Sequence, residues 1–421
     1  MNLKLLCMAA AFAAGAASPA HAAASLPSYN VNTSQTTVSG LSSGAAMATQ
    51  LGYAYSATFK GVGVFAGIPY MCGGHYVYTS CNNATISSSM LSTMQADINN
   101  WSGAAIDNKA NVASQKIYMF VGNSDTTVGP KSMNGVQTQY TNNGVPTASL
   151  DYIKRNSTGH VFPTDFNATG NAPCNSSASP YVANCSYDGA KAALTKFYGT
   201  LNARNDAPAA ANYIQFNQSE FTGNTGMAST GWVYVPANCA IGAVCRVHVA
   251  LHGCVQYYGA IGDKFIKNTG FTRWADTNSI IVLFPQTKAD SSTHTTPANG
   301  TISNPNGCWD AFGWYGTNFA QKAGTQQAAI KAMIDRLSSG SGSHALAAAA
   351  STRSADTAST GGAGACITAS NPAHISAGRA YQGGAYAFAN GSNQDLGLAD
   401  TPGATSLQET APNYFVTGAC Q

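Results

Sequence analysis

Charged side chains are scarce in this sequence, which has 20 Lys and Arg and 17 Asp and Glu in 421 residues. At 9% of the chain they fall far below the roughly 25% of an ordinary soluble domain. This scarcity excludes a charge-driven disordered chain and a long charged coiled coil. The net charge of +3 is too small to indicate a nucleic acid or an acidic macromolecule as partner. Gly, Ser, Thr, Asn and Ala fill the surface instead, which suits an exported protein or one that acts on an uncharged, insoluble substrate.

The sequence also lacks the patterns of a zinc site and of a membrane protein. No Cys-x-x-Cys pair occurs, and no cluster of histidines accompanies the cysteines. Beyond the N-terminal segment, no apolar stretch reaches the ~20 residues that a membrane span needs. We therefore expect no metal, no membrane and no nucleic-acid partner, and we expect a monomer.

The first 22 residues have the features of a secretory signal peptide. Lys4 gives a short basic start, residues 5–17 form an apolar run, and Ala20-His21-Ala22 is an A-x-A cleavage site. The apolar run is too short for a membrane anchor. A secreted, extracellular protein that begins near Ala23 is therefore predicted.

Eleven cysteines are present, and Cys7 would leave with the signal peptide. The other ten are an even number in an oxidising compartment, which predicts five disulfides. Spacing favours three local pairs, and two longer bridges remain for the other four cysteines. The five predicted pairs are Cys72–Cys81, Cys174–Cys185, Cys239–Cys245, Cys254–Cys308 and Cys366–Cys420.

Three segments are expected after the signal peptide. In residues 23–337, strand-like and helix-like runs alternate, and several strand-like runs lack polar alternation, which predicts a largely parallel sheet flanked by helices. Residues 338–365 are rich in Ser, Gly and Ala and should be a flexible linker. Residues 366–421 should form a small β-rich module stapled by its terminal cysteines. The expected strands of the main domain are 61–66, 116–122, 231–236, 246–251 and 279–284, and the expected helices are 44–51, 90–100, 188–198 and 321–337.

A candidate nucleophile lies near the mature N-terminus. Residues 40–44, Gly-Leu-Ser-Ser-Gly, match G-x-S-x-G. An extended segment precedes them and a helix-forming segment follows, which is the strand–turn–helix context of a nucleophile elbow. Ser42 would be the nucleophile, and the backbone N–H of Ser43 could hold an oxyanion. The alternative is a Ser/Gly-rich loop before an ordinary helix.

Chemistry of this kind needs a histidine base oriented by a carboxylate. Asp125 follows the strand-like segment 116–122 by three residues, the expected place for the acid. The chain order Ser–Asp–His then requires a histidine downstream, and His160 is the first one. Asp151 and Asp165 remain alternative acids. The other histidines weighed, which are expected to be structural or on the surface, are His75, His248, His294 and His374.

A second motif, VALHGCVQ at residues 249–256, stands in an unusual place. An apolar strand that runs into His-Gly usually opens an oxyanion loop and precedes the nucleophile, whereas here it lies more than 200 residues after Ser42. Circular permutation explains this order, because the termini of such domains often lie close together. His252 would fix the loop, and Cys254 would offer the second oxyanion N–H while its sulfur is tied to Cys308.

The segments GLSSG, VGNSDTTV, RNSTGH, LHGCVQ and NGCWD, in this order, resemble those of the extracellular poly(3-hydroxybutyrate) depolymerases with a circularly permuted α/β-hydrolase catalytic domain. The resemblance covers roughly residues 25–337. It implies hydrolysis of poly(3-hydroxybutyrate) or a similar polyhydroxyalkanoate through an acyl-enzyme, without metal or cofactor. The tail, residues 366–421, resembles a small C-terminal module of related secreted enzymes, which makes it a candidate polymer-binding unit. Residue by residue, the resemblance implies Ser42 as nucleophile, Asp125 as acid, His160 as base, Ser43 and Cys254 as oxyanion donors, and Trp309 as a contact to the polyester.

Two other functions stay open from the sequence. A secreted feruloyl or acetylxylan esterase could use the same scaffold, since similar LHGC loops occur there in the unpermuted order. A non-catalytic secreted protein that binds carbohydrate or the cell wall could use the tail alone. A serine-reactive phosphonate would label Ser42 in an enzyme and nothing in a binder.

Overall fold

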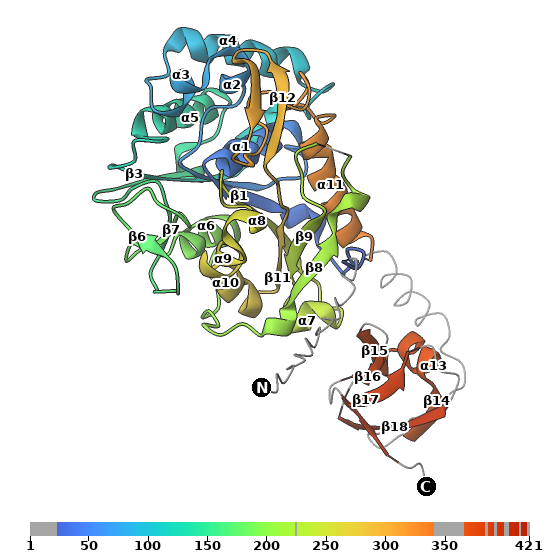
Figure 1. Cartoon of the computed structure of the whole chain (residues 1–421). Coiled ribbons are helices and arrows are strands. Elements are labelled where there is room, and N and C mark those ends of the chain that lie inside the picture. Colours follow the sequence, from blue (N-terminus) through green and yellow to red (C-terminus); the bar gives the residue numbers. More distant parts are fainter. Residues whose placement is uncertain are drawn as a thin grey trace, which may run out of the picture. The chain divides into compact units, whose positions relative to one another are not determined.

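The structure is a computed structural model that describes residues 23–223, 225–340, 366–383, 386–390, 394–399, 404–411 and 414–418. The chain divides into two compact units, one ending at Leu346 and the other beginning at Ala347 (Figure 1). The predicted signal peptide lies outside the described residues, as do residues 341–365 of the predicted linker. The expected linker began too early: Ser338 is still helical, and Gly340 packs against the backbone of Tyr29.

An eight-stranded sheet runs through the first unit in the order β4-β3-β2-β1-β10-β11-β9-β8. The pairs from β4 to β11 are parallel, and β9 and β8 complete the sheet antiparallel. Central strands such as β1 and β11 are buried at every residue, which explains why their sequences lack polar alternation. The strands are β1 (Thr37–Leu41), β2 (Gly61–Phe65), β3 (Lys116–Gly122), β4 (Leu150–Arg155), β8 (Tyr213–Asn217), β9 (Thr230–Tyr234), β10 (Arg246–Leu251) and β11 (Ile280–Phe284).

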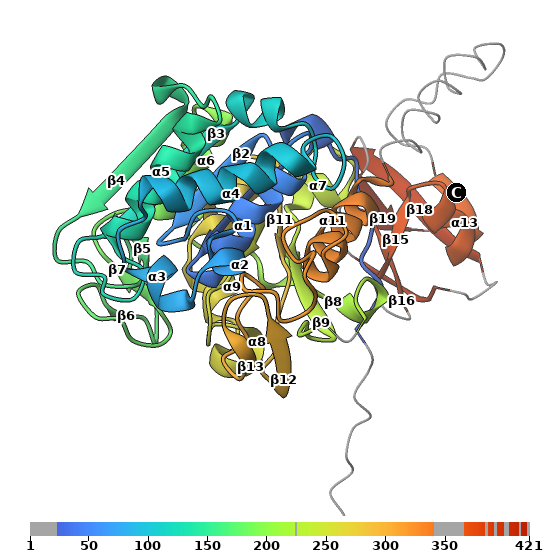
Figure 2. The same cartoon turned by 90° about the horizontal axis from the view of Figure 1, so that it is seen from above.

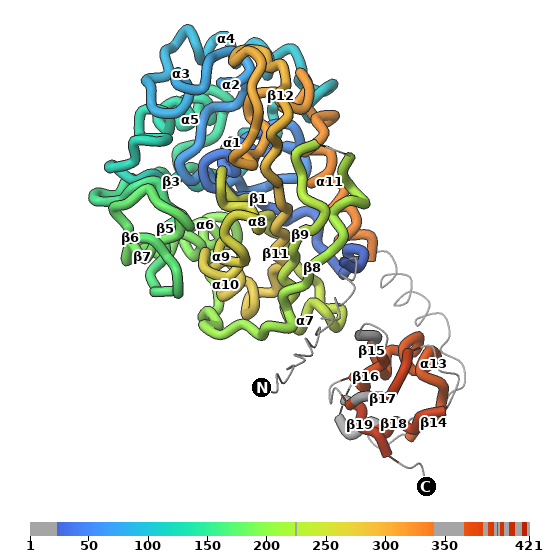
Figure 3. Tube along the Cα trace, in the orientation of Figure 1, coloured from blue at the N-terminus to red at the C-terminus, as the bar shows by residue number. Residues whose placement is uncertain are grey.

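The first strand of the chain lies in the middle of this sheet. β1 pairs with β10, with Thr37 opposite His248, although the two strands are far apart in sequence. In Figure 3, β1 lies inside the molecule, close to the yellow segments that come much later in the chain. Joining the segment that runs from β8 to β11 in front of β1 would restore the usual chain order of an α/β-hydrolase without moving a strand. The fold is therefore the predicted circularly permuted α/β-hydrolase.

Helices cover both faces of the sheet. One group of helices lies on one face and a second group on the other (Figures 1 and 2). The first group is α1 (Ser43–Ala54), α4 (Ser88–Trp101), α5 (Pro130–Asn142) and α11 (Thr325–Ser338), and the second is α6 (Gly189–Tyr198) and α10 (Phe271–Thr277). Helix α1 is buried along its whole length between β1, β2, β10 and α11, which small Ala and Gly side chains permit. Helices α4 and α6 begin at capping side chains, Ser87 and Asp188.

Shorter elements form the loops around this frame. The sequence analysis missed α5 and the exposed hairpin of β12 (Asp290–Thr296) and β13 (Gly300–Asn304), whose residues are mostly Ser, Thr and Asn. The remaining short elements are α2 (Cys72–His75), α3 (Tyr78–Asn82), α7 (Ala237–Ala240), α8 (Tyr258–Ile261), α9 (Lys264–Asn268), β5 (Phe162–Thr164), β6 (Ala172–Pro173) and β7 (Val182–Asn184).

The second unit is β-rich, as expected. Its described residues form two three-stranded sheets, β14-β18-β19 and β15-β16-β17, and the helix α13. Ala380, Ala389, Leu407 and Phe415 form its core. The elements are β14 (Cys366–Ser370), α13 (Asn371–Ser376), β15 (Ala380–Gly383), β16 (Tyr386–Ala389), β17 (Asp395–Leu398), β18 (Ala404–Ala411) and β19 (Tyr414–Thr417).

Four of the expected disulfides are present in the structure: Cys72–Cys81, Cys174–Cys185, Cys239–Cys245 and Cys254–Cys308. Cys366 is also disulfide-bonded, whereas its expected partner Cys420 lies outside the described residues. Within the described part of the chain, no helix is long and apolar enough to span a membrane.

His248 joins the two strands at the centre of the sheet. Its Nδ1 lies 2.8 Å from the Thr37 hydroxyl and its Nε2 2.8 Å from the Ser39 hydroxyl, both on β1. The side chain is fully buried, and burial lowers its pKa to about 3. Since the unfolded chain would bind this proton near pH 6.5, the histidine costs stability as the pH falls below that value.

Replacing His248 by glutamine should therefore flatten the pH dependence of stability. In the wild type, this residue alone should lower the free energy of unfolding by up to ~1.4 kcal/mol for each pH unit between about pH 6 and pH 4. Urea unfolding of the wild type and of His248→Gln across this pH range gives the difference between their free energies of unfolding. Titratable groups that both proteins share contribute equally to the two values. Parallel curves for the two proteins would contradict the prediction.

Candidate active site

Ser42 occupies the tight turn between β1 and α1. Its backbone angles are φ 58° and ψ −121°, a conformation that L-residues rarely adopt and that marks a constrained functional turn. A Cβ at Gly40 would lie 2.3 Å from the backbone of Gly44, and one at Gly44 would lie 2.4 Å from the carbonyl oxygens of Leu251 and His252. Gly40 is thus required by the tightness of the turn itself, and Gly44 is required because the elbow packs directly against the end of β10.

A buried acid–base pair follows the neighbouring strands β3 and β4. His160 Nδ1 lies 2.7 Å from Asp125 Oδ2, and both side chains are almost completely buried. Asp125 Oδ1 accepts hydrogen bonds from the backbone N–H groups of Thr127 and Val128 at 2.8 and 2.9 Å. The carboxylate is held in place, so Nδ1 of His160 keeps its proton and Nε2 can accept one.

The alternative acids have other partners. Asp151 forms an ion pair with Lys196 at 2.8 Å, and Asp165 pairs with Arg204 at 2.6 Å. Neither carboxylate therefore orients a histidine, and Asp125 is the acid that the structure brings to His160.

Other histidine contacts resemble parts of a catalytic triad but lie elsewhere. His75 pairs with Asp97 and His294 with Asp290, and both pairs are partly exposed to solvent. The contact between Ser39 and His248 is buried in the sheet, with both ring nitrogens bonded to hydroxyls of β1. None of these residues lines the cavity described next.

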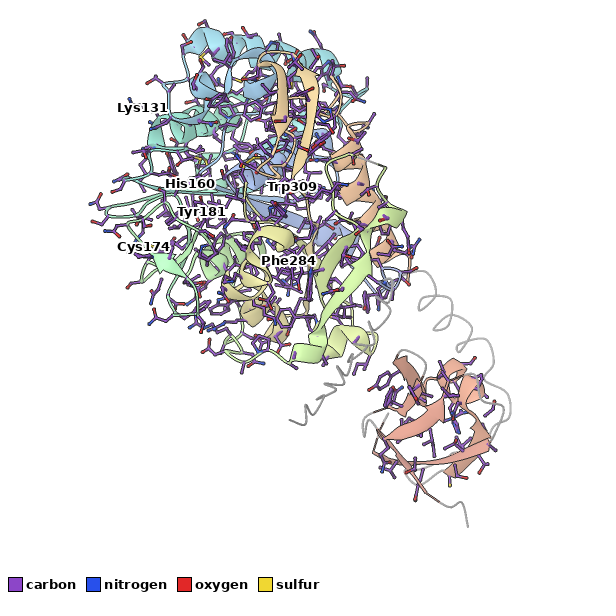
Figure 4. The ribbon with its side chains drawn as sticks, in the orientation of Figure 1. Lys131, His160, Cys174, Tyr181, Phe284 and Trp309 are labelled. Atoms are coloured by element: carbon purple, nitrogen blue, oxygen red, sulfur yellow. A yellow bond between two sulfur atoms is a disulfide. The ribbon has the colours of Figure 1, made fainter. Side chains whose placement is uncertain are left out.

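Ser42 and His160 line one open cavity of about 300 Å³. Tyr181 lies beside the base, with its ring centroid 6.4 Å from that of His160 (Figure 4). Among the described residues, Ser42 Oγ has no hydrogen-bond partner, and in serine hydrolases the bond to the base often tightens only with substrate. Apart from His160, the cavity is lined by uncharged side chains, which include Leu41, Ala46, Ile68, Asn82, Asn306 and Phe312.

Two backbone N–H groups border this cavity without a partner in the described part of the chain. The N–H of Ser43 is in the first turn of α1, where no intrahelical acceptor exists. On each side of Cys254 the neighbouring N–H is occupied: Gly253 donates to Gln256 Oε1 at 2.6 Å, and Val255 donates to the Asn306 carbonyl at 2.7 Å. The groups that remain available are thus the N–H of Ser43 and the N–H of Cys254, which are the two predicted oxyanion donors.

His252 holds this loop. Its Nδ1 donates to the Gly253 carbonyl at 2.7 Å, and its Nε2 accepts from the Thr287 N–H at 3.2 Å. The ring is fully buried, and burial lowers its pKa to about 4, so it stays neutral at physiological pH. This arrangement agrees with the structural role expected for the residue.

Trp309 lies elsewhere than expected. Its side chain is fully buried and does not line the cavity, so the structure offers no direct contact between it and a polymer. The disulfide Cys254–Cys308 draws this residue beneath the oxyanion loop, where its ring lies 5.4 Å from that of His252. Two later residues of the same segment, Ala311 and Phe312, line the cavity in its place.

The sequence analysis missed three residues that shape the site. Ser177 Oγ accepts from the His160 N–H at 2.9 Å, Tyr181 flanks the base, and Gln256 bonds the oxyanion loop. Gln256 belongs to the LHGCVQ motif and could have been singled out there. No local sequence pattern marks Ser177 or Tyr181, because only the tertiary structure of residues 156–185 brings them next to His160.

Asp125→Asn should lower kcat on a soluble ester by about 10⁴-fold with little effect on folding. The amide oxygen can keep the two backbone N–H bonds, which turns the NH₂ group toward His160 Nδ1. The imidazole would then carry its proton on Nε2 and could not accept the serine proton. Steady-state kinetics and a melting curve test this, and a variant within tenfold of the wild-type rate would contradict it.

Comparisons with known proteins agree with this geometry. No protein-family model matches the chain. A polyhydroxybutyrate depolymerase of Talaromyces funiculosus is 49% identical over 321 residues, which cover 76% of this chain and 94% of the relative. A poly(3-hydroxybutyrate) depolymerase of Delftia acidovorans is 39% identical over 487 aligned residues, 95% of each chain. Because 95% of 421 residues exceeds the 346 of the first unit, the Delftia match extends into the second unit.

Solved structures give the same result for the catalytic unit. The crystal structure of PHB depolymerase from Penicillium funiculosum matches with a TM-score of 0.73 at 49% identity, over 75% of this chain and 99% of that one. A serine-to-alanine variant of a PHB depolymerase, complexed with an R3HB trimer, matches with the same values.

Proposed function

The chain belongs to the poly(3-hydroxybutyrate) depolymerase family, and we propose that it is a secreted serine esterase that hydrolyses poly(3-hydroxybutyrate) or a similar polyhydroxyalkanoate to monomers or short oligomers. The observation that carries the proposal is the buried Asp125–His160 pair, whose histidine lines one cavity with the strained Ser42. The uncharged lining of that cavity suits a neutral aliphatic ester, since a charged substrate would lose hydration there without gaining an ionic partner.

In the first half of the proposed reaction, Ser42 Oγ attacks an ester carbonyl carbon while His160 Nε2 takes the hydroxyl proton. The carbonyl oxygen becomes an oxyanion that accepts hydrogen bonds from the Ser43 and Cys254 N–H groups. Each such donor is worth about 2.7–4 kcal/mol at the transition state. His160 then protonates the leaving alkoxide, which departs as the hydroxyl end of the polymer and leaves an acyl group on Ser42.

In the second half, water attacks the acyl-enzyme and gives a proton to His160. The same two N–H groups stabilise the second oxyanion. When it collapses, Ser42 Oγ leaves and recovers its proton from His160, and a hydroxyalkanoic acid or short oligomer is released. The chemistry requires only side chains and backbone groups of this chain.

Film clearing tests the proposed substrate. The wild type should clear a poly(3-hydroxybutyrate) film and release hydroxybutyrate monomers or short oligomers, while Ser42→Ala should not. The same preparations are assayed on feruloyl sugars and acetylated xylan. Faster turnover of those esters, with no film clearing, would replace the proposed function by that of a feruloyl or acetylxylan esterase.

Secretion as a monomer is part of the proposal. Disulfides persist in oxidising compartments, and the four described disulfides support export from the cytoplasm. N-terminal sequencing of the protein from culture medium, together with size-exclusion chromatography, tests both points.

We propose further that the module of residues 366–421 binds solid polymer. Tyr386 and Phe388 share one face of β16, opposite Leu398 and Tyr381 on the adjoining strands, and Tyr381 stacks on Phe388 at 5.6 Å. Tyr381, Tyr386 and Leu398 are 42%, 47% and 48% exposed, whereas Ala389 of the same strand is buried in the module core. The module thus presents a partly exposed aromatic face that could adsorb to an aliphatic polyester.

Truncation after Gly340 should separate adsorption from chemistry. The Penicillium structure corresponds to 75% of this chain over 99% of its own length, so a protein lacking the module should fold. It should hydrolyse a soluble short-chain ester at nearly the full rate but bind polymer film less and clear it more slowly, because the tether no longer raises the local concentration. Loss of soluble-ester activity together with a lower melting temperature would show instead that the module supports the catalytic fold.

A further inference from the structure

Gln256 connects two parts of the active site. Its side chain is buried, with 1% of the residue exposed, and both the oxygen and the nitrogen of its carboxamide form hydrogen bonds. Oε1 accepts from the Gly253 N–H at 2.6 Å, and Nε2 donates to the Pro180 carbonyl at 2.7 Å. The first partner belongs to the oxyanion loop, and the second lies 76 residues away in sequence, on the side of the site that holds the base.

On the oxyanion side, Gln256 fixes the peptide that precedes Cys254. With Gly253 bonded to Gln256 and Val255 bonded to Asn306, the Cys254 N–H is held between two anchored neighbours. A Cβ at Gly253 would lie 3.2 Å from Ser42 Cβ, so this loop directly borders the nucleophile. A shift of the Gly253 peptide would therefore move the donor relative to Ser42.

On the other side, Gln256 fixes the segment against which His160 is placed. Tyr181 follows Pro180, its ring faces the base at 6.4 Å, and its carbonyl accepts from the Phe162 N–H at 2.8 Å. Ser177, earlier in this segment, accepts from the His160 N–H at 2.9 Å. The position of this segment therefore sets the position of the imidazole.

We propose that Gln256 is a positioning residue that sets the spacing between the oxyanion donor Cys254 and the base His160. The inference rests on the proposed function, because both groups must reach one tetrahedral carbon formed on Ser42. A carboxamide suits this position, since it accepts from one backbone and donates to the other across a fixed length. Its loss should affect the transition state more than substrate binding.

Gln256→Met, of similar length but without either hydrogen bond, gives the main test. On a soluble ester we expect kcat to fall about 10²-fold, the effect of a misplacement near 1 Å, while KM changes less than threefold. Affinity for a boronic acid that mimics the tetrahedral intermediate should fall by a similar factor. A kcat within threefold of the wild type, or a loss carried by KM alone, would overturn the proposal.

Gln218 provides a matched control for the loss of buried hydrogen bonds. It is fully buried, donates to the carbonyls of Ala228 and Gln286 at 2.7 Å, and accepts from the Gln286 N–H at 2.9 Å. It does not line the active-site cavity. Gln218→Met should lower the melting temperature as Gln256→Met does, but leave kcat unchanged. If both variants lost kcat in proportion to stability, Gln256 would be structural only.

Gln256→Glu adds a pH readout that a structural role would not produce. The introduced carboxyl can accept from Gly253 when ionised, but it can donate to the Pro180 carbonyl only when protonated, and burial raises the pKa of such a group. The ratio of its kcat to that of the wild type should therefore rise as the pH falls from 8 to 6. A flat ratio would contradict the bridging role. The titratable groups around this position are His160, Tyr181, His252 and Tyr257. An ionised carboxylate at position 256 would favour protonated His160 and lower the ratio as the pH falls, which is opposite to the expected change.

The two proposals fail in distinguishable ways. If the wild type hydrolyses no ester and a phosphonate does not label it, the proposed function is wrong. If the wild type is active and labelled at Ser42 while Gln256→Met retains full kcat, only the role of Gln256 is wrong.

Discussion

Ser42→Ala is expected to lower kcat on a soluble ester by up to ~10⁶-fold while the protein stays folded. Without the hydroxyl no acyl-enzyme can form, and only the oxyanion donors and substrate binding remain to assist attack by water. Because alanine also lacks a long side chain, the strained turn between Gly40 and Gly44 should persist. Activity on p-nitrophenyl butyrate and a melting curve measure both effects.

Ser39→Ala is the matched control, since Ser39 contacts a histidine in the sheet rather than at the cavity. It should keep its rate and lose about 1–3 kcal/mol of stability, because a buried ring nitrogen of His248 loses its partner. A serine-reactive phosphonate should label the wild type and Ser39→Ala but not Ser42→Ala. Full activity in a folded Ser42→Ala protein, or labelling that depends on Ser39, would show that Ser42 is not the nucleophile.

His160→Ala should have an effect of similar size, up to ~10⁶-fold on kcat, because the serine hydroxyl is a weak nucleophile without a base. Combining it with Ser42→Ala should lower the rate little further, since the two residues act as one unit. Rates of the two single variants and the double variant on one soluble ester measure this non-additivity.

Two other histidines serve as controls for His160→Ala. His75 and His294 also pair with aspartates, but both pairs lie outside the cavity and are partly exposed. Alanine at either position should change kcat less than threefold, in line with the small contribution of exposed ion pairs. If His75→Ala or His294→Ala abolished activity while His160→Ala did not, the triad described above would be incorrect.

Local signals in the sequence were sufficient to predict the elements that carry the proposed catalytic groups. The elbow at Ser42 could be predicted because a strand, a tight glycine turn and a helix are encoded by neighbouring residues. Asp125 and His160 could be predicted because each follows a strand, and parallel strands end at the same edge of the sheet. The permuted order of motifs agrees with the structure, in which β10 lies beside β1.

Contacts between distant segments were decided only by the tertiary structure. The sequence analysis expected Trp309 at the polymer, but a large aromatic side chain is equally suited to the core, and packing beneath the oxyanion loop buries it completely. The bridge from Gln256 to Pro180 spans 76 residues and depends on where two loops meet. Strand and turn preferences act over a few residues, whereas such contacts arise when the sheet brings separate loops to one edge. The sequence by itself therefore determined the types of the proposed catalytic residues and the elements that carry them. The fold decided the spacing of these residues and which other residues support them.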